Sequence, residues 1–207
     1  AESSDLYIVP RFRTAFIDLF SPIPTLGFLC SFFNAKGDFF EGSPSYLITK
    51  ARRKLEEETG YQLEAMGELE YYIITEKDDL FPANDQKGYH ESSPFNKTAG
   101  FRREAMDMIA KCGGRIKYAH SEVGNFTIGD KNYEQNEIEF LPVALEDAAD
   151  QLAIAKWILR KLAFTKGFTI TFSPKITVGK AGSGLHIHMR LKKGDKEVML
   201  NSEGLLS

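Results

Sequence analysis

The chain has 207 residues, 43% of them apolar and 27% charged, with a formal net charge of −3. This is a globular composition, and the length suits one large domain or two small ones. No run of Lys and Arg dominates, so we expect no nucleic-acid partner. The longest apolar stretch, around 25–33, is too short to span a bilayer, and residues 1–5 lack the pattern of a signal peptide, so we expect no membrane partner. Cys30 and Cys112 are too far apart for a metal-binding motif and fit reduced thiols in a cytoplasmic protein.

The N-terminal half is predicted to contain short strands, then a helix, then a long strand. The helix is expected at about 45–59, where Ser43 can cap its start and Gly60 can end it. The expected strands and loop are a strand at 6–9 ended by Pro10, a hairpin of 28–33 with 39–40, a strand at 62–75 and a polar loop at 78–97.

The C-terminal half is predicted to alternate helices and strands. Helices are expected at about 98–112 and 145–166, each followed by glycine. Strands are expected at 115–122, 133–140, 168–172 and 185–191, with turns at 124–132 and 179–184 and a last hairpin turning at 193–195.

Three of the expected strands carry two potential metal ligands spaced two residues apart. The pairs are Glu68 with Glu70, Glu137 with Glu139, and His186 with His188. Side chains at i and i+2 of a strand point to the same face, so each pair could contribute to one site. Glu122, at the end of a fourth strand, adds a carboxylate. Carboxylates with an imidazole would suit Mg²⁺ or Mn²⁺.

Each pair also fits a half-exposed strand whose polar side chains face water. Spacing alone does not show that the three pairs meet in space. The segment Gly182-Ser183-Gly184, directly before Leu185-His186-Ile187-His188, is more informative, because glycines let the backbone approach a ligand closely.

Several motifs together resemble the glutamine synthetase family, in the family's order and across nearly the whole chain. They are Ser4-Asp5-Leu6-Tyr7-Ile8-Val9-Pro10, Ser43-Pro44, Gly67-Glu68-Leu69-Glu70-Tyr71-Tyr72, His120-Ser121-Glu122-Val123, Gln135-Asn136-Glu137-Ile138, Phe172-Ser173-Pro174-Lys175 and Gly182-Ser183-Gly184-Leu185-His186-Ile187-His188. The last of these is the most specific.

The resemblance implies a role for individual residues. Glu70, Glu122 and Glu137 would hold one divalent cation, Mg²⁺ or Mn²⁺, and Glu68 with His186 would hold a second. His188 would lie against the phosphates of ATP, and Gly182 would lie at the glutamate substrate. The resemblance gives Gln135 and Glu139 no metal role, so Glu139 is expected to be solvated or structural. It assigns no catalytic residue.

The resemblance also implies an α+β fold with a curved, mostly antiparallel sheet and helices on its outer face. Residues 1–207 would be the N-terminal portion of the catalytic domain, without the family's N-terminal β domain and without the C-terminal part of the catalytic domain. The parent protein would be a cytoplasmic, ring-shaped homo-oligomer. It would join ammonia to the γ-carboxylate of glutamate at the expense of ATP, through γ-glutamyl phosphate. The fragment alone is expected to be inactive.

Some positions depart from the family pattern. Ala181 stands where an Asn that helps to hold glutamate is usual, Arg190 stands where a Ser is common, and Ser121 replaces a His. The segment from Gly124 to Tyr133 is also longer than in the compact family version. Two alternatives therefore stay open: a γ-glutamyl ligase for another amine, and a non-catalytic structural or regulatory protein with the same fold.

Overall fold

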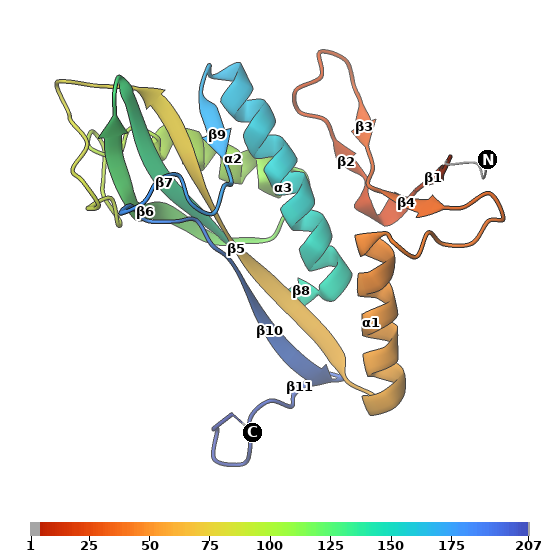
Figure 1. The fold of residues 1–207 in the computed structure, drawn as a ribbon. Helices are drawn as coiled ribbons and strands as arrows, with labels where there is room; N and C mark the ends of the chain where they lie inside the picture. Colours follow the sequence, from red (N-terminus) through yellow and green to blue (C-terminus); the bar gives the residue numbers. More distant parts are fainter. Residues whose placement is uncertain (1–4, 207) are drawn as a thin grey trace. The chain divides into compact units, whose positions relative to one another are not determined.

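A computed structural model describes residues 5–206 (Figure 1), so Ser4 of the opening motif lies outside the described residues. The chain forms two compact units. One unit takes in residues up to Ala65, Pro142–Asp150 and the residues from His188 onward; the other takes in Met66–Leu141 and Gln151–Ile187. Within the described part of the chain, no helix has the length and apolarity needed to cross a membrane.

The first unit begins with short antiparallel pairs. Its elements are β1 (Tyr7–Pro10), a 3₁₀ turn (Phe12–Thr14), β2 (Phe16–Ile17), β3 (Leu26–Gly27), β4 (Cys30–Phe33) and α1 (Pro44–Thr59). β1 pairs with β4, so Pro10 ends up as a strand residue opposite Cys30 rather than the residue after the strand. The predicted hairpin of 28–33 with 39–40 forms as a short one, with an antiparallel bridge between Phe33 and Phe39. The Phe40 N–H donates to the Phe32 carbonyl and the Asn34 N–H to the Asp38 carbonyl, both at 2.9 Å.

Both ends of α1 lie where the sequence predicts, but only the C-terminal end is capped in the predicted way. Gly60 ends the helix in the left-handed conformation (φ 69°), and its N–H donates to the Glu56 carbonyl at 2.8 Å. Ser43 occupies the N-cap position, but its side chain makes no capping bond. Its hydroxyl instead lies 2.8 Å from that of Ser45, which satisfies the polar group that would otherwise cap the helix.

The remaining elements build one sheet and two further helices. They are β5 (Gln62–Glu76), α2 (Ala99–Lys111), β6 (Ile116–Ile128), β7 (Lys131–Phe140), β8 (Val143–Ala144), α3 (Leu145–Thr165), β9 (Thr169–Thr171), β10 (Leu185–Lys193) and β11 (Lys196–Glu197). The strand order is β11-β10-β5-β7-β6, with β8 and β9 also pairing with β5. The described registers are antiparallel, which confirms the predicted α+β class with an antiparallel sheet.

The two faces of the central strands in the second unit have different surroundings because the pleat alternates side chains. Leu69, Tyr71 and Ile73 of β5 are at most 1% exposed, and the Tyr71 ring lies 6.4 Å from that of Phe101 in α2. A Cβ on Gly67, on this same face, would meet the Leu152 side chain of α3 at 2.7 Å. The helix-facing side of β5 therefore supplies the core, and the opposite side carries Glu68 and Glu70.

The predicted turn at 124–132 is wrong, because β6 and β7 continue through it as a hairpin that turns at Gly129-Asp130 (Figure 1). Phe126 of β6 and Tyr133 of β7 stack with ring centroids 5.0 Å apart, and this contact stabilises the extended hairpin. The register jumps between Ser121 and Asn125, so that residues 122–124 bulge opposite a single residue of β7. Such a bulge re-aims the side chains that it carries.

Gly124 in this bulge has no room for a side chain. A Cβ there would lie 1.8 Å from the Tyr72 hydroxyl oxygen. We expect Gly124→Ala to lower the free energy of unfolding by about 3 kcal/mol or more, because overpacking in a rigid interior forces the backbone to shift. Gly100→Ala is the control: nothing lies within 4 Å of that site in α2, so it should be neutral or stabilising by up to about 1 kcal/mol. Urea denaturation of both variants checks this, and equal stabilities would contradict the packing argument.

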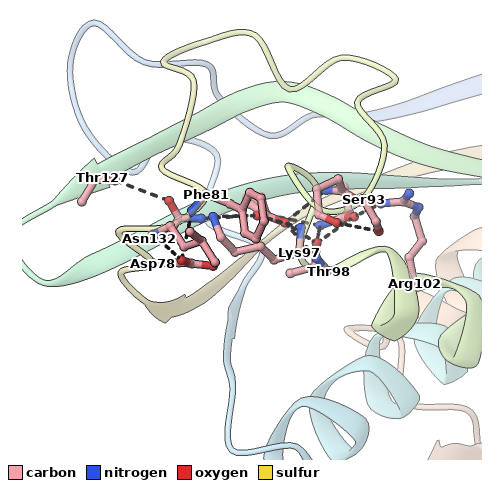
Figure 2. Close-up of polar contacts among 12 residues, drawn as sticks. Asp78, Phe81, Ser93, Lys97, Thr98, Arg102, Thr127 and Asn132 are labelled. Atoms are coloured by element: carbon pink, nitrogen blue, oxygen red, sulfur yellow. Dashed lines mark hydrogen bonds and ion pairs between the residues drawn. The ribbon is translucent and has the colours of Figure 1, made fainter.

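The loop between β5 and α2 is anchored behind the sheet by a buried carboxylate, that of Glu134. Glu134 Oε2 accepts from the Thr98 N–H (3.0 Å), the Thr98 hydroxyl (2.9 Å) and Asn96 Nδ2 (3.1 Å), while Oε1 accepts from the Lys97 N–H (3.0 Å). Figure 2 shows Lys97, Thr98 and Arg102 gathered in this network. The start of α2 is thereby fixed to β7.

The same loop also covers the free edge of β6. The N–H groups of Gln86, Gly88 and His90 donate to carbonyls of Asn125, Val123 and Ser121 at 2.9, 3.1 and 3.0 Å. These donors alternate as they would in a strand, so the loop satisfies an edge that would otherwise be open to pairing with another chain.

Candidate functional site

Strand register gathers acidic side chains on the face of the sheet opposite the helices. Glu70 of β5 lies directly across from Glu137 of β7, which in turn lies across from His120 of β6. One step along the sheet, Glu68 lies across from Glu139. Directly opposite residues of antiparallel strands share a face with Cβ atoms about 5 Å apart. Two of the three predicted ligand pairs therefore do meet in space.

His120 lies between two of the carboxylates. Its Nε2 is 3.5 Å from Glu137 Oε2, and its Nδ1 is 3.6 Å from Glu122 Oε1. Glu122 is the first residue of the bulge in β6, and its carboxylate lies on the same side of the sheet as the other acidic groups. One ligand atom each from His120, Glu137 and Glu139 lie within 4.8 Å of one another, and all three residues are buried.

Glu137 shows the electrostatic consequence of this crowding. Its pKa is raised from 4.5 to about 8, first because burial disfavours the charged form and then because Glu122, Glu68, Glu70 and Glu139 repel its charge. Without a cation, repulsion among these carboxylates destabilises the cluster. A bound divalent cation would offset that repulsion.

His186 joins the cluster from the start of β10. Its Nδ1 lies 3.1 Å from Glu68 Oε2, which brings together the two residues expected to hold a second cation. The backbone before it is packed tightly, since a Cβ on Gly184 would lie 2.9 Å from His186 Nε2 and 3.0 Å from Glu70 Oε1. Gly184 therefore lies in close contact with the ends of two candidate ligand side chains.

The glycine-rich turn at 179–184 is held by three side chains. Tyr72 donates to the Ala181 carbonyl (2.8 Å), Gln135 Nε2 donates to the Gly182 carbonyl (2.8 Å), and Gln86 Oε1 accepts from the Ala181 N–H (2.7 Å). Burial, followed by repulsion from Glu70 and Glu122, raises the pKa of Tyr72, so its hydroxyl stays a donor. Gly182 itself leaves no space for a side chain, because a Cβ would lie 2.4 Å from the Pro174 carbonyl oxygen.

His188 is the last of the predicted site residues, two positions after His186 in β10. His188 is an exposed residue of β10 and belongs to the other unit. In that unit Arg190 is held by Glu64, with Nε at 2.6 Å from Oε2. Burial raises the pKa of Glu64, but the hydrogen bonds and charges of Arg190 and Lys192 together outweigh it and lower the pKa overall. The unusual arginine thus serves as a cross-strand ion-pair partner.

Two members of the cluster, Glu139 and His120, have no ligand role in the family resemblance, although spacing alone had made Glu139 a candidate. Glu139 is 5% exposed and its Oε2 accepts from Lys117 Nζ at 2.8 Å, so the expectation of a solvated side chain is wrong and the structural alternative stands. In the sequence, His120 stands out only as the first residue of the motif His120-Ser121-Glu122-Val123. Its spacing of two from Glu122 would have suggested a shared face, but strand alternation alone does not predict the bulge that lies beside it.

The donor set fits hard divalent cations. Five carboxylates offer oxygen ligands, and His186 and His120 offer imidazole nitrogens; the carboxylates are those of Glu68, Glu70, Glu122, Glu137 and Glu139. Oxygen-rich sites with one imidazole suit Mg²⁺ and Mn²⁺. These groups form an acidic centre on one face of the sheet, beside the glycine-rich turn, and their donor atoms suit divalent cations.

Comparisons with known proteins agree with this class. The family described as "Glutamine synthetase, catalytic domain" matches residues 41–207. The chain is 29% identical to the glutamine synthetase of Thermotoga maritima over 98% of its own length and 45% of that protein. It is also 29% identical to the glutamine synthetase of Thermus thermophilus, over 93% of its length and 43% of that protein. The chain therefore spans under half the length of these relatives.

Solved structures agree on the fold. The glutamine synthetase of Plasmodium falciparum superposes with a TM-score of 0.85 at 19% identity, covering 97% of this chain and 44% of the other. A structure described as a novel glutamine synthase homolog gives 0.74 at 16% identity. The chain belongs to the glutamine synthetase family, and its fold is part of that family's catalytic domain.

Proposed function

We propose that the protein carrying this chain is an ATP-dependent ligase that joins ammonia to the γ-carboxylate of glutamate. The γ-carboxylate attacks the γ-phosphorus of ATP, forming γ-glutamyl phosphate and releasing ADP. Ammonia then attacks the acyl carbon and displaces phosphate. The observation that carries the proposal is the gathering of Glu68, Glu70, Glu122 and Glu137 on one face of the sheet.

The physical demand of this reaction matches that acidic face. Two anions must meet, and divalent cations held by Glu70, Glu122 and Glu137 on one side and by Glu68 and His186 on the other would neutralise the phosphate oxygens. The turn that carries Gly182 is hydrogen-bonded to Gln135, which also donates to Glu70, and is proposed to receive glutamate. His188 is proposed to lie near the ATP phosphates.

The parent protein is further proposed to be cytoplasmic and to form a ring of identical subunits. Both proposals rest on family membership. The chain alone is proposed to bind cations without completing the reaction, since it spans under half of its relatives.

Calorimetric titration of this chain with Mn²⁺ and Mg²⁺ tests the cation centre. We expect binding that is lost in the double variant Glu70→Ala with Glu137→Ala. A matched control, Glu76→Ala with Glu104→Ala, removes two carboxylates that pair with Lys131 and Lys166 instead, and should bind like the unmodified chain. Equal heats in all three proteins would contradict the proposed centre.

The reaction itself is tested on the full-length protein by phosphate release from ATP with glutamate and ammonia. Release that requires another amine in place of ammonia would identify a different γ-glutamyl ligase. Nucleotide binding without release under either condition would identify a non-catalytic member of the family.

A further inference from the structure

Gln135 of β7 lies at the centre of the candidate site, although no ligand role falls to it. It is 1% exposed and lies two residues from Glu137, on the same face of the strand. Its cross-strand partner on β5 is Tyr72, and on the β6 side it stands opposite the bulge of residues 122–124. A buried amide in this position needs partners for both of its ends.

Three separate segments meet at this one side chain. Gln135 Nε2 donates to Glu70 Oε2 at 2.7 Å and to the Gly182 carbonyl at 2.8 Å, and Oε1 accepts from the Gly124 N–H at 3.0 Å. A carboxylate and a carbonyl can only accept, and an N–H can only donate. The orientation of the amide is therefore fixed by its partners, and its two hydrogens are both used.

Another side chain of this size could not make the same three bonds. A glutamate would turn an oxygen toward Glu70, and a leucine would leave the Gly124 N–H and the Gly182 carbonyl without this partner. Glycine at both bonded backbone positions is required as well, because a Cβ at 124 would lie 2.7 Å from Gln135 Oε1 and one at 182 would meet the Pro174 carbonyl. The positions that contact the Gln135 side chain therefore accommodate an amide of this length.

We propose that Gln135 is a positioning residue that holds Glu70, the bulge after Glu122 and the Gly182 turn as one hydrogen-bonded unit. This inference rests on the proposed function, in which Glu70 and Glu122 bind a cation and the turn receives the amino-acid substrate. Cation binding at the carboxylates and ordering of the turn are then coupled through one amide. Partners of metal ligands typically change metal affinity by about 10–100-fold when they are removed.

The test compares Mn²⁺ affinity in the unmodified chain, Gln135→Leu and Gln135→Asn, with the free ion followed by electron paramagnetic resonance. We expect both variants to bind at least about tenfold more weakly. Gln135→Asn keeps the amide but withdraws it by one methylene, so that it cannot bridge Glu70 and Gly182. Gln151→Leu is the matched control, because Gln151 is also buried and also accepts from a backbone N–H, that of Arg115, at 3.1 Å.

Hydrogen exchange gives the second readout. In the unmodified chain, Mn²⁺ should slow amide exchange in residues 179–184, whereas in both Gln135 variants a saturating concentration should leave that segment unchanged. Unaltered Mn²⁺ affinity in a folded Gln135 variant overturns the inference. Loss of the fold in both Gln135 variants, with Gln151→Leu still folded, also overturns it and makes Gln135 a residue of stability alone. If the unmodified chain binds no Mn²⁺, it is the proposed cation centre that fails.

Discussion

Glu134→Ala is expected to lower the free energy of unfolding by about 4 kcal/mol, because each buried donor that loses its partner costs about 1–3 kcal/mol. The change would remove the acceptor of the Lys97 and Thr98 N–H groups and of the Asn96 amide. The Thr98 hydroxyl would keep only its longer bond to Asn136 Oδ1, at 3.4 Å. Denaturation in urea, followed by circular dichroism, measures the loss.

The loop that Glu134 anchors should respond before the rest of the chain unfolds. Trypsin should cut Glu134→Ala within residues 78–98, for example after Lys87, faster than it cuts the unmodified chain. Glu104→Ala is the control, since this glutamate of α2 is partly exposed and pairs only with Lys166 among the described ion pairs. Similar stability and cleavage rates in the two variants would mean that Glu134 does not hold the loop.

Glu137→Gln is expected to stabilise the cation-free chain at alkaline pH while removing its response to Mn²⁺. The pKa of Glu137 is about 8 in the folded chain, against an ordinary value of 4.5. The folded state therefore binds its proton more tightly than the unfolded state does. That contribution to stability is fully present below pH 4.5 and is lost as the pH rises to 8.

The size of this effect follows from the shift. One pKa unit corresponds to about 1.4 kcal/mol, so the rise from 4.5 to about 8 corresponds to at most about 5 kcal/mol. Solvent screening reduces this value, and we expect the unmodified chain to lose about 3 kcal/mol between pH 5 and pH 8. Glu137→Gln carries no charge at this position, so its stability should fall much less. Urea denaturation in EDTA at pH 5, 6.5 and 8 measures both profiles.

Adding Mn²⁺ at pH 8 shows whether the stability of Glu137→Gln comes from removal of the negative charge or from another effect of the amide. The unmodified chain should regain stability, because a ligand that binds only the folded state stabilises it. Glu137→Gln should regain little, and Glu104→Gln should behave like the unmodified chain throughout. Parallel pH profiles for Glu137→Gln and the unmodified chain would contradict the assignment of the strained charge to Glu137.

The sequence alone predicts much of the local structure, because the signals act over a few residues. Gly60 ends α1 where expected, since glycine adopts the left-handed conformation without strain. The final hairpin pairs Lys193 with Lys196 around Gly194-Asp195, as its turn residues predict. Period-two spacing also places Glu68 with Glu70, and Glu137 with Glu139, on one face.

The sequence does not predict the long β6–β7 hairpin. Gly124–Asn132 has the composition of a turn, and a local pattern cannot show that Phe126 will stack on Tyr133 or that Tyr72 requires a glycine at 124. These contacts form only when the strands are paired. For the same reason the sequence does not reveal Gln135 as the side chain on which three segments converge.

Glu134 and Glu137 show which features of the site the sequence determines and which depend on the tertiary structure. Both are buried glutamates of one strand, yet one anchors a loop on the helix-facing side and the other joins the carboxylates on the opposite side. Alternation along a strand is local, so the sequence determines which residues share a face. Which residues lie opposite each other is a choice of register between distant segments, and a slip of one residue would exchange the two faces. Only the tertiary structure, through its buried core and its bulge, decides that choice and so decides which acidic residues meet.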